Sequence, residues 1–202
     1  MRLDDAVDED DLESRFKKPL TQKEIKLLDA IARLDYGGAY SSYAAKKLGI
    51  SLITAGVHTA SLRDKLSVSK TAAAVYIALN RGYISYGSII EGIEPQLAQV
   101  EAGVRAFTPR EIGFFRAFSK LLLSGSCSSK DIGEILGISV YTSYVHYTHI
   151  KEKLGLFKNQ TINQAQLATV AYHFSGHYYF SQRERLAQLD SRLDRFKPLV
   201  QI

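Results

Sequence analysis

Only one cysteine, Cys127, occurs among the 202 residues of the chain. Because a disulfide needs two cysteines, none can form within the chain, and we expect a reducing, cytoplasmic location. No apolar run reaches the roughly 18 residues that a membrane helix requires. The acidic N-terminus also lacks the apolar core of a secretory signal. A membrane is therefore not among the expected partners.

Basic residues are scarce in the first 15 positions, which hold seven acids but only two bases, a balance of −5. Since the whole chain carries +5, the remaining residues carry +10. That charge suits a polyanionic partner, although an ordinary soluble protein can also have a high isoelectric point. With 46% hydrophobic and 23% charged residues, the composition is that of a globular protein. We expect residues 1–19 to form a flexible acidic tail.

The chain contains one segment twice. Leu20–Ile25 is echoed by Phe107–Ile112 at an offset of 87 residues, and Leu48–Ser51 by Leu136–Ser139 at an offset of 88. Four further pairs share the offset of 88: Thr54 with Thr142, His58 with His146, Lys65 with Lys153, and Leu66 with Leu154. So many matches in one register indicate a duplicated domain in which the second copy has one inserted residue.

Each copy has the signature of four helices, so the predicted fold class is all-α. A threonine followed three residues later by glutamate is a capping box, and both Thr21 and Thr108 begin one. Gly49 and Gly137 are placed to end a short second helix. The later helices are expected at about 43–48, 52–66 and 70–81, and at about 130–136, 140–154 and 162–174. A short helix, a glycine turn and a longer helix make a helix-turn-helix.

Two four-helix domains are therefore predicted, at 20–84 and at 107–176. The connector between them, 85–106, contains three glycines and a proline and is expected to be helical around 96–104. The segment 177–202 is expected to form a C-terminal helix with one apolar stripe, made of Leu186, Leu189, Leu193 and Phe196. That stripe either packs on its own domain or forms a dimer, because DNA-binding proteins commonly pair to cover two half-sites.

The order of these motifs resembles the LuxR-type helix-turn-helix, which is the DNA-binding domain of LuxR, NarL and FixJ regulators. The first copy matches at Leu20–Glu24, Leu48–Ser51, Thr54, His58 and Lys65–Leu66, and the second copy matches at the repeated positions. The helix-turn-helix of sigma-factor region four is a related alternative. Single LuxR-type domains usually follow a receiver or ligand-binding domain, and too few residues precede Leu20 for one.

The resemblance implies a bacterial regulator that binds specific sequences of double-stranded DNA through tandem units to control transcription. It implies no cofactor. Further partners would be a second copy of the chain, RNA polymerase or another LuxR-type regulator.

The recognition helices of this family would be 52–65 and 140–153. Family residues that reach bases lie two, three and six positions after the threonine, which here gives Gly56, Val57 and Ala60 against Tyr144, Val145 and Thr148. Neither set has the long cation that usually reads guanine. The base-facing residues are expected to be Thr54 and Val57 in the first copy and Thr142, Tyr144, Val145 and Thr148 in the second. The second copy is therefore expected to discriminate between base sequences better than the first.

Phosphate contacts fix the register of a protein on DNA without choosing its sequence. The expected phosphate-binding residues of the first copy are Ser51, His58, Arg63, Lys65 and Lys70. Those of the second copy are Ser139, His146, Lys151, Lys153 and Lys158. For the two histidines, packing against the domain is the alternative to phosphate contact.

The main rival hypothesis is a protein-interaction module, an antiactivator or coactivator that binds other LuxR-type proteins through the fourth helices. An acidic tail that competes with DNA for the basic surface is a further hypothesis. His173 and His177 are four residues apart, but no cysteine or acidic cluster completes a metal site. The chain has no phosphate-cradling glycine loop and no nucleophile motif, so no enzyme activity is predicted.

Overall fold

Every regular element in the described residues is an α-helix, which confirms the all-α prediction. The computed structural model describes residues 19–36, 39–91, 94–125, 127–155 and 163–174. The first half contains α2 (Gln22–Ala32), α3 (Tyr40–Leu48), α4 (Leu52–Lys65), α5 (Thr71–Asn80) and α6 (Tyr86–Ile90). The second half contains α7 (Glu94–Arg105), α8 (Pro109–Leu123), α9 (Ser129–Leu136), α10 (Val140–Lys153) and α11 (Gln164–His173). None of the helices in these residues is both long and apolar enough to cross a bilayer.

The predicted capping boxes begin α2 and α8. Thr21 accepts a hydrogen bond from the Glu24 amide, and the Glu24 carboxylate accepts one from the Thr21 amide. Thr108 and Glu111 make the same pair of bonds at the start of α8. Each box satisfies amides that the first helical turn leaves without a partner. Asn163 caps α11 in a third capping box, which the sequence analysis did not identify.

Glycine turns separate the second and third helices of both copies. Gly49 ends α3 and Gly137 ends α9, each with a φ of 64° in the left-handed region that favours glycine. The connection to α4 and α10 is then only three residues long in each copy. α3 begins at Tyr40, three residues before the expected start, and no side chain caps it there.

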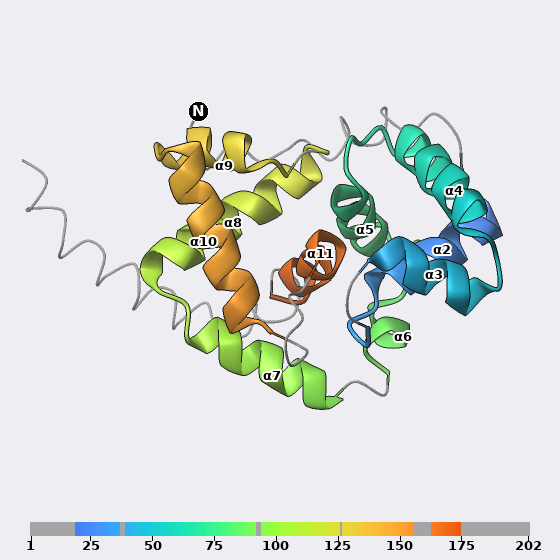
Figure 1. Cartoon of the computed structure of the whole chain (residues 1–202), viewed down its shortest axis with the longest axis horizontal. Helices are drawn as coiled ribbons and strands as arrows, with labels where there is room; N and C mark the ends of the chain where they lie inside the picture. The colour runs from blue at the N-terminus through green and yellow to red at the C-terminus, as the bar shows by residue number, and fades with distance from the viewer. Residues whose placement is uncertain (1–18, 37–38, 92–93, 126, 156–162, 175–202) are drawn as a thin grey trace, which may run out of the picture.

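The fourth helices of the two copies, α5 and α11, pack against each other in the middle of the molecule (Figure 1). Every residue from 71 to 79 and from 165 to 171 is buried. α5 also contacts α8 of the second copy, and α11 contacts α2 of the first. The two copies therefore share one continuous hydrophobic core, with α4 and α10 on opposite sides of the central pair (Figure 1).

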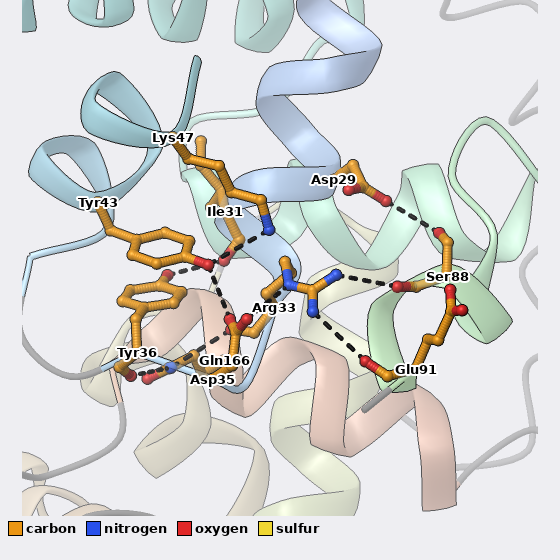
Figure 2. Close-up of polar contacts among 10 residues, drawn as sticks. All are labelled: Asp29, Ile31, Arg33, Asp35, Tyr36, Tyr43, Lys47, Ser88, Glu91 and Gln166. Carbon is orange, nitrogen blue, oxygen red and sulfur yellow. Dashed lines mark hydrogen bonds and ion pairs between the residues drawn. The ribbon is translucent and has the colours of Figure 1, made fainter. Parts of the chain in front are cut away.

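Polar groups of α11 fasten it to the end of α2. The side-chain amide of Gln166 donates to the Tyr36 carbonyl at 2.7 Å and to the Arg33 carbonyl at 3.3 Å (Figure 2). The hydroxyl of Thr169 donates to the Ala32 carbonyl at 2.7 Å. Carbonyls at a helix C-terminus lack hydrogen-bond donors within their own helix. Here the side chains of α11, in the other copy, supply those donors.

The connector 85–106 contains α6 and α7, and the prediction of a helical stretch within it is confirmed. Arg33 holds α6 by donating to the carbonyls of Ser88 and Glu91 (Figure 2). α7 lies against the C-terminal end of α10, where Gly103 approaches the Lys153 backbone so closely that a Cβ would clash. This close approach explains why glycine occupies position 103, in the last turn of α7.

Candidate nucleic-acid interface

The exposed large apolar side chains of the described residues gather on the two predicted recognition helices. On α4 they are Leu52, Ile53 and Val57, which we call the α4 face. On α10 they are Val140, Tyr141 and Tyr144, which we call the α10 face. The seventh such residue, Ile135, is on α9 and is only 38% exposed, against 81% for Ile53 and 77% for Tyr141. Apolar side chains gathered at equivalent places on both copies indicate a binding surface.

Burial on the other side of each helix fixes the direction of the two faces. Ala55, Thr59 and Leu62 of α4 are buried, at the spacing of one helical stripe. Ser143 and Ile150, seven residues apart, are the buried residues of α10. The α4 and α10 faces therefore point away from the core.

Serine caps both helices in the same way. The Ser51 hydroxyl accepts from the Thr54 amide at 3.0 Å and lies 2.8 Å from the Thr54 hydroxyl. Ser139 and Thr142 repeat these distances at the start of α10. Both serines are exposed, at a helix end where free amides and the helix dipole attract anionic oxygens. Their expected place near DNA phosphates is compatible with this position.

Lys65 and Lys153 are engaged within the protein. The Lys65 ammonium lies 2.7 Å from the Glu24 carboxylate, and Lys153 lies 2.7 Å from Glu111. Burial alone would raise the pKa of Glu24, but hydrogen bonds from Lys65, Thr21 and Ser61 overcome it and lower the pKa to about 2. We therefore remove both lysines from the expected phosphate-binding set. In the sequence, the glutamate and the lysine of each pair belong to separate motifs. The sequence does not show that the fold brings these two motifs together.

The other expected phosphate ligands differ in their surroundings. Lys70 is exposed at the start of α5. Arg63 is half-buried and donates to the Ser69 carbonyl at 3.1 Å. The Lys151 ammonium lies 5.1 Å from the centre of the Tyr147 ring, and burial lowers its pKa. Lys158 lies outside the described residues.

The two repeated histidines are half-buried on the recognition helices. The ring of His146 packs at 6.4 Å from that of Phe114 on α8, so the packing alternative fits this residue. His58 has the equivalent position on α4.

Among the expected base-facing residues, Thr54, Val57 and Tyr144 are exposed, whereas Thr142, Val145 and Thr148 are half-buried. The Thr148 hydroxyl donates to the Tyr144 carbonyl at 3.1 Å, so that donor is already used within α10. Tyr144 is therefore a better candidate reader than Thr148.

Sequence reasoning missed four members of the two faces: Leu52, Ile53, Val140 and Tyr141. The sequence does contain a pattern that could have identified them, because each is an apolar residue in one of the two positions directly after a capping serine. Those positions are the first two residues of each helix, and all four of their side chains are exposed.

The part of the chain that the structure describes shows no cluster of side chains suited to a metal ion. These residues contain no group of three or more His, Cys, Asp and Glu side chains placed to hold a metal ion. His173 instead meets Tyr86 through its Nδ1 atom, at 2.5 Å from the phenol oxygen, and His177 lies outside the described residues. Burial raises the pKa of Cys127 to about 11, so the thiol stays protonated near neutral pH.

Comparison of the chain with protein-family models, with curated protein sequences and with solved structures found no match.

Proposed function

We propose that this protein is a transcription regulator that binds double-stranded DNA through two LuxR-like helix-turn-helix units in tandem. The recognition helices are α4 and α10, each entering a major groove with its exposed face. The main support for this proposal is the location of the α4 and α10 faces. Six of the seven exposed large apolar side chains of the described residues lie at the starts of these two helices, which occupy equivalent positions in the repeat.

The packing of α5 on α11 supports a dimer-like use of the two units. Many DNA-binding proteins cover two half-sites with the two subunits of a dimer. Here a single chain carries both units, and the contacts of α5 with α8 and of α11 with α2 fix them to each other. The tandem therefore acts as a covalent pseudo-dimer.

Few cations are available to hold the DNA backbone. Once Lys65 and Lys153 are assigned to their carboxylates, the remaining phosphate-binding cations are Arg63, Lys70, Lys151 and Lys158. Each phosphate neutralised by a cation contributes a slope of roughly −0.9 to a plot of log affinity against log salt concentration. Four cations give a slope of about −4, which is shallow for a DNA-binding protein.

The test is equilibrium binding of the full chain to a labelled duplex over a series of salt concentrations. Lys70→Ala and Lys151→Ala should each weaken binding to all duplexes alike and reduce the slope by about 1. Arg105→Ala on α7 is the matched control, since this exposed cation lies on the connector and pairs with Glu101. Absence of binding even at low salt would refute the proposal.

A second candidate function is supported by the α4 face itself, which consists of three apolar side chains without a cation among them. Such a surface also fits a protein partner, for example another LuxR-type regulator. The partner cannot dock through the fourth helices, as the sequence hypothesis had it, because residues 71–79 and 165–171 are buried against the core. An Ile53→Asp variant that loses binding to a purified LuxR-type regulator, with DNA binding intact, would favour this candidate.

A further inference from the structure

The two copies exchange equivalent contacts. α5 of the first copy packs on α8, the first helix of the second copy, and α11 of the second packs on α2, the first helix of the first. Between identical subunits, a two-fold axis generates this kind of exchange. The helices α4 and α10, which carry the two faces, lie on opposite sides of the α5–α11 pair (Figure 1), so one chain presents the faces in a dimer-like relation.

The α4 face has almost no hydrogen-bonding capacity. Leu52 is 55% exposed and Val57 is 63% exposed, and Ile53 beside them is more exposed still. The other exposed residues in the first two and a half turns are Gly56, Ala60 and Thr54. The Thr54 hydroxyl is already within hydrogen-bond distance of Ser51. This face therefore cannot read donors and acceptors on base edges.

The α10 face has the opposite character, although it occupies the equivalent place. Tyr141 and Tyr144 each carry a phenol hydroxyl on an exposed ring, and His149 is exposed one turn further on. These groups can donate or accept hydrogen bonds in a groove. The two halves of the chain are thus alike in backbone and unlike in surface chemistry.

Only one base presents an apolar group in the major groove of DNA, and that group is the C5 methyl of thymine. An apolar face that cannot form hydrogen bonds can discriminate among bases only through this methyl and through local shape. Three exposed aliphatic side chains within two turns of one helix match a run of such methyl groups.

We infer that one chain binds, as a monomer, a two-part DNA site with chemically different halves. The half under α4 is thymine-rich and is read through its methyl groups by Leu52, Ile53 and Val57. The half under α10 is read through the hydroxyl groups of Tyr141 and Tyr144. This inference rests on the proposed DNA-binding function.

The experiment begins with duplexes enriched from a random pool by the full-length protein. Thymines of each half of the enriched site are then replaced by deoxyuridine, which lacks only the methyl group. A buried methyl is worth about 0.8 kcal/mol, so each lost contact should weaken binding about fourfold. The loss is expected in one half of the site and not in the other.

The triple variant Leu52→Ala/Ile53→Ala/Val57→Ala identifies which half lies under α4. All three side chains are exposed, and alanine favours a helix, so the variant should fold. It should bind normal and deoxyuridine duplexes equally. Ile135→Ala, which removes an exposed apolar side chain from α9, should keep the full methyl dependence.

Three results would overturn the inference while leaving DNA binding itself intact. The first is equal binding of thymine and deoxyuridine sites by the unaltered protein. The second is a methyl dependence that survives the triple variant, and the third is a requirement for two chains per site. Absence of any DNA binding would instead refute the proposed function.

Discussion

Glu24 and Glu111 are buried carboxylates that play the same part in the two copies. Each accepts a hydrogen bond from a capping threonine amide and forms an ion pair with a lysine in the last turn of α4 or α10. One side chain thus caps the first helix and also anchors the third. Because an uncompensated buried charge is costly, both partners are needed together.

We expect Lys65→Ala to lower the free energy of unfolding by about 3 kcal/mol, since it leaves Glu24 buried without its cation. Glu24→Gln/Lys65→Ala should lose less than the sum of the two single variants, because no isolated charge remains. Denaturant titration of the four proteins near pH 7 measures this coupling. Additive losses would mean that the pair contributes nothing.

The same pair predicts a dependence of stability on acidity. The pKa of Glu24 is about 2 in the folded protein, below the ordinary value of 4.5. A lowered pKa adds stability above pH 4.5, which is lost as the pH falls from about 4.5 to about 2. The stability advantage of the unaltered protein over Glu24→Gln should therefore shrink across this window. An advantage that does not change with pH would contradict the assignment.

On α10, Tyr144 and Thr148 were both expected to read bases, and the structure separates them. Tyr144→Ala should reduce the preference for cognate over scrambled duplex about tenfold, within the roughly 1–3 kcal/mol of a good direct contact. Thr148→Ala should change it less, because the Thr148 hydroxyl bonds to the Tyr144 carbonyl. Val57→Ala should also change it less, since it removes only a methyl contact. Competition binding at fixed salt decides the order, and a larger effect of Thr148→Ala would reverse the assignment.

At the scale of elements, the junction of α11 with α2 depends on Gln166. This buried side chain donates to the Arg33 carbonyl at the end of α2 and to the Tyr36 carbonyl in the loop that follows (Figure 2). Gln166→Ala should destabilise the protein by about 1–3 kcal/mol, because buried acceptors would lose their donor. Gln22→Ala, at an exposed position at the start of α2, is the control. Equal stability of the two variants in thermal unfolding would show that the junction does not depend on this amide.

The elements themselves could largely be predicted from the sequence, because their signals are local. The capping boxes at Thr21 and Thr108 and the turns at Gly49 and Gly137 lie within a few residues of what they determine. The partner of Lys65 could not be predicted, since it lies 41 residues away. The α4 and α10 faces were predicted only in part. The positions that reach bases in the resembled family correspond to Val57 and Tyr144, but not to the first two residues of each helix.

Across the molecule, the position of the fourth helices decides which surfaces are buried and which stay exposed. Their burial against each other joins the two copies through one core and leaves the α4 and α10 faces exposed. We propose that a single chain holds DNA at two places, one under each face. Two recognition helices of a dimer-like protein meet one side of the duplex about one helical turn apart, which is roughly 10 base pairs.

Hydroxyl-radical footprinting of the full chain on an enriched duplex shows whether the chain contacts DNA at one place or at two. We expect two protected patches about 10 base pairs apart, with one chain bound per duplex. The triple alanine variant of the α4 face should weaken protection in one patch, and Tyr141→Ala/Tyr144→Ala should weaken it in the other. A single patch that depends on one helix alone, or protection that neither variant changes, would show that the two helices do not bind DNA as a pair.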